Sequence, residues 1–76
     1  MPYVTLGKSS LDFVEFYVFD ENSKQCGTLY YFYSKIKDPI WKKSGNIPKE
    51  IDEDKSNIER IATSILISNL KAKDSN

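Results

Sequence analysis

Few side chains in this sequence could carry out a reaction. The chain has 76 residues, no histidine and a single cysteine, Cys26. Histidine is the commonest general base, and a zinc site needs several Cys or His ligands, so a histidine-based triad and a zinc centre are excluded. Cys26 lies near Lys24 but has no histidine to activate its thiol. We interpret Cys26 as a thiol without a catalytic role.

Two short motifs are similar to ligand-binding loops but lack residues that such loops require. Residues 7–9, Gly-Lys-Ser, end like a phosphate-binding P-loop, yet Pro2 stands where the loop needs its first glycine. Residues 52–56 begin like a calcium loop, yet Asn57 and Thr63 stand where the loop needs a glycine and a bidentate glutamate. We therefore predict no cofactor and no metal ion.

Glu15 is the carboxylate that interrupts an aromatic strand sequence. Acid–base catalysis by paired carboxylates needs a second carboxylate within reach, and the expected residue across the hairpin is Phe32. We interpret Glu15 as a residue of a sheet surface or of an interface rim. The sequence therefore argues against an enzyme.

Three predicted strands position these side chains. Residues 3–7 end at a glycine and indicate a short strand. Residues 11–19 and 28–36 are rich in aromatic and β-branched residues, and the polar segment 20–27 between them predicts an antiparallel hairpin. Residues 37–54 contain the helix breakers Pro39, Gly45 and Pro48, which exclude a long helix there. A short extended piece fits around Ile40 and Trp41.

One long helix is predicted over residues 56–72. Ser56 and Glu59 fit a capping box at its start. At about 100° per residue, its apolar residues form one stripe: Ile58, Ile61, Ala62, Ile65, Leu66 and Leu70. The predicted fold is a single α+β domain over residues 1–76. It is a three-stranded antiparallel β-meander with the C-terminal helix packed on one face.

The hairpin carries apolar side chains on both of its faces. Pairing Val18 with Leu29 and Phe16 with Tyr31 places one set toward the helix: Val14, Phe16, Val18, Leu29, Tyr31 and Tyr33. The opposite face then carries an aromatic set of candidate partner-binding residues: Phe13, Tyr17, Phe19, Tyr30 and Phe32. Because one helix covers only one face, this aromatic set is predicted to be a contact surface.

The charge is balanced overall but unevenly distributed. Eleven basic and eleven acidic residues give a net charge of zero, which argues against a DNA-coating protein and against an acidic DNA mimic. Residues 35–49 are basic and residues 50–54 are acidic. This pattern fits a solvated loop or a bipolar contact surface. The basic loop adds further candidate partner-binding residues: Trp41, Lys37, Lys42 and Lys43.

Two functions of different classes fit these features. The first is a small non-enzymatic protein-binding module, an inhibitor or regulator that occludes a protein target with its aromatic face and the Trp41 loop. This hypothesis includes a homodimer through the open face or the sheet edge. The second is a single-stranded nucleic-acid binder that uses the aromatic strand face and the lysines of residues 35–49.

The remaining features predict where the protein works. A single cysteine favours a reducing compartment, and the sequence shows neither a signal peptide nor an apolar run long enough to cross a membrane. We expect a cytoplasmic protein with no membrane partner. Its size and composition are typical of proteins that phages and mobile elements encode against host machinery.

Overall fold

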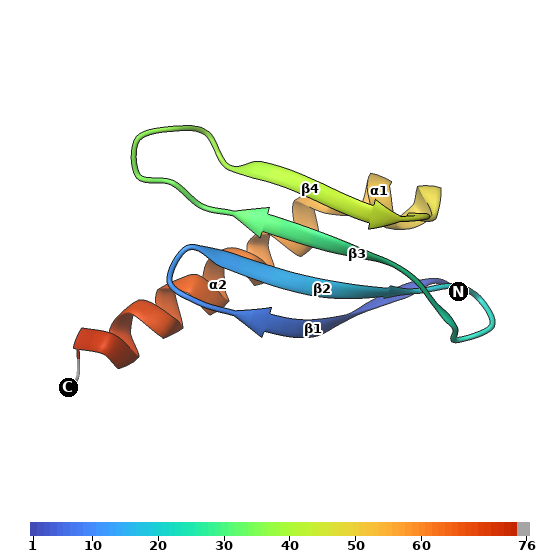
Figure 1. The fold of residues 1–76 in the computed structure, drawn as a ribbon, viewed down its shortest axis with the longest axis horizontal. Coiled ribbons are helices and arrows are strands. Elements are labelled where there is room, and N and C mark those ends of the chain that lie inside the picture. Colours follow the sequence, from blue (N-terminus) through green and yellow to red (C-terminus); the bar gives the residue numbers. More distant parts are fainter. Residues whose placement is uncertain (75–76) are drawn as a thin grey trace.

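The computed structural model describes residues 1–74 and shows one antiparallel sheet with its helices on a single face (Figure 1). The strands β1 (Tyr3–Ser9), β2 (Phe13–Phe19), β3 (Gln25–Phe32) and β4 (Ile40–Gly45) lie side by side in chain order. The helices α1 (Lys49–Glu53) and α2 (Lys55–Asp74) follow them. The α+β class, the antiparallel meander and the C-terminal helix are confirmed.

The sheet has four strands where the sequence predicted three. β4 pairs with β3 from Ile40 opposite Phe32 to Gly45 opposite Gly27. Its lysine-rich sequence does not show the apolar pattern of a strand, because β4 lies at the edge of the sheet, where several side chains face water. Gly45 ends β4 with a φ of 77°, and a Cβ there would lie only 2.6 Å from the carbonyl oxygen of Cys26. This close approach of two strands requires glycine.

The turn between β2 and β3 gives the hairpin a different register from the predicted one. The Asp20 carboxylate accepts hydrogen bonds from the backbone N–H of Asn22 (2.8 Å) and of Lys24 (3.1 Å). This tight turn lets β3 begin at Gln25, so Phe16 pairs with Leu29 instead of Tyr31. The shift is two residues, and a two-residue shift keeps every side chain on its original face. The predicted faces of the hairpin therefore remain the same.

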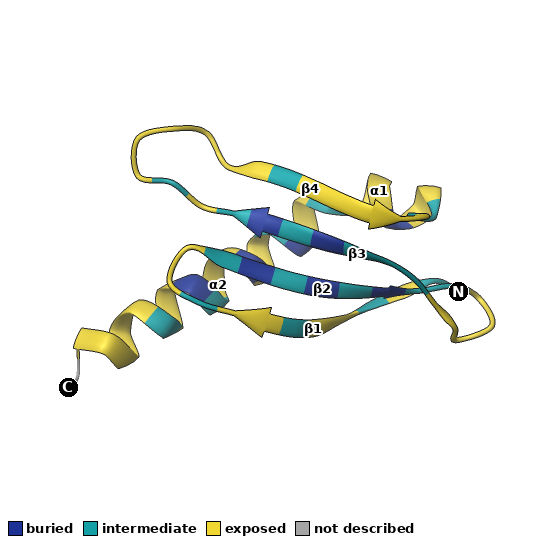
Figure 2. Ribbon diagram, in the orientation of Figure 1, coloured by how far each residue is buried: buried dark blue, intermediate teal, exposed yellow. Residues whose placement is uncertain are grey.

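The core lies between the sheet and the helices. Burial alternates along β2 with the two-residue period of a strand (Figure 2). The sheet contributes five buried residues and the helices four: Val14, Phe16, Val18, Leu29 and Tyr31, with Ile51, Ile58, Ala62 and Leu66. Tyr33 was predicted to join them, but it follows the end of β3 and is 46% exposed. Ile61 and Leu70 of the predicted helix stripe also remain about half exposed.

The predicted helix cap at Ser56 is wrong. α2 begins at Lys55, immediately after Asp54, so Ser56 lies inside the first turn and is exposed. The Asp54 carbonyl accepts hydrogen bonds from the N–H groups of Asn57 (3.1 Å) and Ile58 (3.2 Å). Its carboxylate also accepts one from the Asn57 side-chain amide at 2.6 Å. The acidic residues Glu50, Asp52 and Glu53, which precede the predicted helix, lie in the separate short helix α1. α1 ends at Glu53, so α2 begins right after Asp54, at Lys55 and not at Ser56.

Candidate interaction surface

The face of the sheet that points away from α1 and α2 is not covered by any element of the described chain, residues 1–74 (Figure 1). We call it the open face. Strand pairing and side-chain alternation assign it these residues: Tyr3, Thr5, Gly7, Phe13, Glu15, Tyr17, Phe19, Thr28, Tyr30, Phe32, Ile40, Lys42 and Ser44. All five aromatic residues that the sequence predicted for this surface therefore lie on it.

Five aromatic rings of the open face form two groups of contacting rings. Tyr3 stacks on Phe19 with ring centroids 5.1 Å apart. The Phe32 ring lies 6.0 Å from Phe13 and 6.2 Å from Tyr30. These β2 and β3 rings are half-buried by one another, while their outer sides remain in contact with water. Each group of rings is therefore held in place by its own contacts before any partner arrives.

Glu15 is held in a defined position among these rings. Its Oε1 accepts a hydrogen bond from the backbone N–H of Lys8 at 3.1 Å. A hydrogen bond between the Tyr17 hydroxyl and the Glu15 carboxylate raises the Tyr17 pKa above its ordinary value of 10.0, and the negative charge adds to this effect. Gly7 leaves room for the arrangement, because a Cβ there would lie 2.7 Å from Glu15 Oε1. Across the hairpin, Tyr30 and not Phe32 is the partner of Glu15.

Residues of β2, β3 and β4 form three rows across the open face. The apolar row is Phe13, Phe32 and Ile40. The charged row is Glu15, Tyr30 and Lys42, and the polar row is Tyr17, Thr28 and Ser44. Neighbouring strands lie about 4.8 Å apart, so the backbone positions of Glu15 and Lys42 are separated by about 10 Å. The charged row therefore has one negative end and one positive end.

Trp41 does not join the open face. It pairs with Tyr31 on the side covered by the helices, and the two rings meet edge-on at 5.0 Å. Trp41 is half-buried against the core, and Lys55 Nζ lies 5.8 Å from its ring centroid. Trp41 was predicted as a partner-binding residue of the basic loop; the structure places it in β4 on the helix side, because its position has the opposite parity to the open face.

The structure also separates the predicted lysines. Lys42 lies on the open face, with its Nζ 5.7 Å from the Phe32 ring centroid. Lys43 points to the helix side, where its charge acts on Asp52. Lys37 lies in the exposed loop between β3 and β4. Of the three predicted lysines, only Lys42 lies among the rings.

Sequence reasoning left Tyr3 and Ile40 out of the site. Tyr3 is 40% exposed and stacks on Phe19 from β1. Ile40 is 50% exposed and completes the apolar row at the β4 edge. Tyr3 and Thr5 alternate with Val4 and Leu6, and this strand alternation could have placed Tyr3 on the open face. Ile40 joins the open face only through the pairing of β4 with β3.

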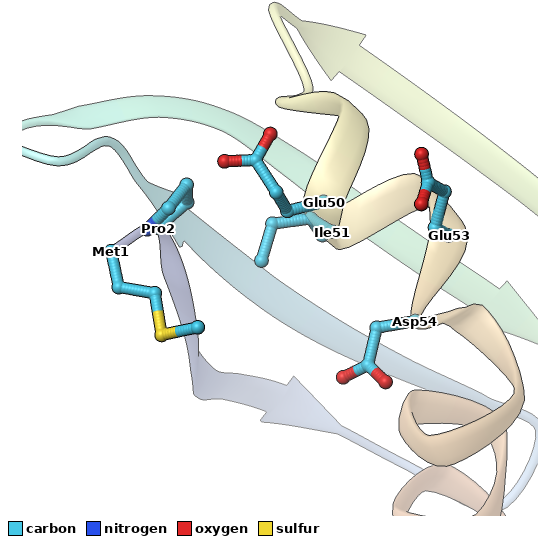
Figure 3. A pocket seen from close by; sticks show the side chains of 6 residues that line it. All are labelled: Met1, Pro2, Glu50, Ile51, Glu53 and Asp54. Carbon is cyan, nitrogen blue, oxygen red and sulfur yellow. The ribbon is translucent and has the colours of Figure 1, made fainter.

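Shallow depressions also lie elsewhere on the molecule, among them two beside the helices. One of about 390 Å³ lies beside α1 and is lined by Met1, Pro2, Glu50, Ile51, Glu53 and Asp54. The carboxylates of Glu50, Glu53 and Asp54 point in different directions (Figure 3). Within residues 1–74, no three His, Cys, Asp or Glu side chains are grouped to hold a metal ion. The other, of about 370 Å³, is an apolar groove beside α2: Leu11, Tyr33, Lys35, Thr63, Leu66, Ile67, Leu70 and Lys73 line it.

The helices of the described residues offer little further indication of function. α2 has 20 residues, but neither it nor α1 is long and apolar enough to cross a membrane. No protein-family model matches the chain, and no curated protein and no solved structure is significantly similar to it.

Proposed function

We propose that this chain is a non-enzymatic protein-binding module that occludes part of a protein target with its open face, as an inhibitor or regulator. The proposal rests on two groups of contacting aromatic rings on a sheet face that no helix of residues 1–74 covers. Contiguous apolar patches of this kind mark interaction sites, and aromatic residues supply most of the binding energy in such sites. Rings already fixed by their neighbours lose little conformational entropy on binding.

The charges of the open face favour a protein target over a single-stranded nucleic acid. Nucleic-acid platforms combine aromatic rings with a positively charged track for the phosphates. Here Lys42 is balanced by Glu15 in the same row, and Lys37 and Lys43 lie elsewhere. The face therefore offers rings without a positive track.

The sheet edges are poor alternatives to the open face. The β4 edge carries Lys42 and Lys43, and exposed lysines on an edge oppose the addition of another strand. The pairing of β1 with β2 is irregular between Leu6 and Ser9, which interrupts the other edge. Both features favour contact through the face.

The proposal is tested by site-specific photocrosslinking in the cells of origin. A photoreactive phenylalanine analogue replaces Tyr30 in one variant and Ser64, exposed on α2, in the other. We expect a protein target to be crosslinked from position 30 and not from position 64. Binding of the purified target should then weaken about tenfold or more in Phe32→Glu, as for a hot-spot residue, and stay unchanged in Ser64→Glu.

Two results would overturn the proposal. One is equal target affinity of Phe32→Glu and Ser64→Glu, which would place the contact away from the open face. The other is crosslinking that disappears after nuclease treatment, together with an affinity that falls steeply as salt is raised. That second result would establish the nucleic-acid alternative, because phosphate contacts release counterions.

A further inference from the structure

We infer that the open face also binds a second copy of this chain, in a twofold face-to-face dimer whose alignment is set by Glu15 and Lys42. The inference rests on the proposed function only in that the open face must be a binding surface. It adds the partner, the symmetry and the residues that fix the alignment.

The proposed symmetry axis uses the position of β3 between β2 and β4, and it leaves β1 without a facing strand. A twofold axis that runs along β3, midway between two facing sheets, places β3 of one copy over β3 of the other. The same axis places β2 of each copy over β4 of the other. Aligned sheets pack about 10 Å apart, with strand directions about 30° apart, and an axis that bisects this angle satisfies both conditions.

Under this symmetry each row of the open face meets its own copy in reverse order. In the charged row, Glu15 of each copy lies over Lys42 of the other copy, and the two Tyr30 rings meet at the axis. In the apolar row, Phe13 lies over Ile40 of the other copy. The dimer therefore gains two ion pairs and matches apolar side chains with apolar ones.

The alternative in-plane axis, perpendicular to the strands along the charged row, gives a poor match. It would place Glu15 over Glu15 and Lys42 over Lys42, so that like charges meet. It would also place the apolar row over the polar row of Tyr17, Thr28 and Ser44. Like charges across an interface suppress the wrong alignment, so the row composition selects the axis along β3.

The overlap of the two sheets is small. The two longer dimensions of the molecule, 42 and 24 Å, include the helices and loops. Three facing strands of about seven residues, at about 3.3 Å per residue and about 4.8 Å between strands, overlap over roughly 350 Å². This is less than the roughly 800 Å² that each partner buries in a standard interface, so we expect a weak, reversible dimer. Because copy and target would use the same face, dimerisation competes with target binding.

The test exchanges the two charges and measures mass by sedimentation equilibrium. We expect a dimer for the wild type and at least about a tenfold higher dissociation constant for Glu15→Lys and for Lys42→Glu, because each single variant replaces two ion pairs by two like-charge contacts. An equimolar mixture of the two variants should form a heterodimer, since both of its contacts again join opposite charges. A mass tag on one variant identifies that heterodimer.

Matched controls separate this alignment from a general loss of solubility or folding. Lys43→Glu makes the same charge change on the other side of β4 and should leave the dimer intact. Circular dichroism checks that each variant is folded. Lys42 is exposed on an edge strand, so Lys42→Glu alone decides the test if Glu15→Lys fails to fold.

Three results would overturn the inference. The first is a wild type that is monomeric at about 100 μM, roughly a hundredfold above a micromolar dissociation constant. The second is single variants that dimerise like the wild type. The third is a mixture of the two variants that stays monomeric. A monomeric wild type that still loses its target on Phe32→Glu would remove the dimer and leave the proposed function in place.

Discussion

At the scale of single residues, Glu15 shows how one carboxylate is accommodated in an aromatic surface. Its Oε1 accepts a hydrogen bond from the Lys8 backbone N–H, and its carboxylate accepts one from the Tyr17 hydroxyl. Gly7 supplies the space beside it. A charged group on an apolar surface is costly unless its hydrogen bonds are made, and here Lys8 of the neighbouring strand and Tyr17 of the same strand make them. The carboxylate is thus fixed in place, as the alignment of a second copy requires.

Replacing Glu15 by glutamine should lower the Tyr17 pKa toward its ordinary value, because the charged hydrogen-bond acceptor is lost. In the wild type the Tyr17 pKa is raised, so the stability from this bond is present below about pH 10 and is lost as pH rises through the folded-state pKa. Titration of tyrosinate absorbance in dilute solution measures the shift, with Tyr17→Phe identifying the signal. The Tyr31 pKa, raised mainly by burial, should not move. Identical curves for wild type and Glu15→Gln would contradict the assignment.

At the scale of elements, the junction between α1 and α2 shows the limit of local sequence signals. Ser56 and Glu59 have the spacing of a capping box, yet α2 begins at Lys55. The Asp54 carbonyl and carboxylate both accept hydrogen bonds from residues of the first turn of α2. α1 buries Ile51 against the core, and this burial fixes where the chain turns into α2. Tertiary packing therefore overrides the capping signal.

Ser56→Ala should leave the free energy of unfolding unchanged or raise it by about 0.5 kcal/mol, because alanine has the higher helix propensity inside a helix. Asp54→Ala should lower it by about 0.5–1.5 kcal/mol, the range for the loss of one hydrogen bond. Urea unfolding of both variants makes the comparison. A loss of about 1 kcal/mol or more in Ser56→Ala would mean that Ser56 is the cap after all.

At the scale of the whole molecule, the fold is one thin layer of side chains between a sheet and two helices. Its largest fully buried side chains all come from β2 and β3: Phe16, Leu29, Val14 and Val18. β1 and β4 add partly buried groups, among them Val4 and Trp41. Asn69 ties α2 to the turn between β1 and β2 by donating to the Ser10 carbonyl at 2.9 Å. The central hairpin therefore carries most of the core on the sheet side.

Phe16→Ala should lower the free energy of unfolding by about 3–5 kcal/mol, the range for a phenylalanine in a core. The wild-type phenylalanine is only 2% exposed. At about 0.05–0.15 kcal/mol per residue, a chain of this length has a total stability of similar size, so the variant should be largely unfolded. Circular dichroism at one fixed chain concentration measures this, because the proposed dimer would also add stability. Ile67→Ala, at a half-exposed site, is the control and should stay within about 0.5 kcal/mol of wild type.

The sequence by itself determined the elements with strong local periodicity and the faces of the central hairpin. β2, β3 and α2 lie within a few residues of their predicted ranges. The aromatic set from Phe13 to Phe32 lies on the predicted side although the register is shifted by two residues. A strand side chain depends only on parity, and parity is unchanged by such a shift.

Only the tertiary structure decided which residues become neighbours across strands. The β4 edge strand, the helix-side position of Trp41 and the row that joins Glu15, Tyr30 and Lys42 all depend on pairings between distant segments. The Asp20 turn sets the register of β2 and β3, and the close approach of Gly45 to Gly27 ends the pairing of β4. Local periodicity carries no information about such pairings, because they are fixed by hydrogen bonds and packing that exist only after the chain has folded.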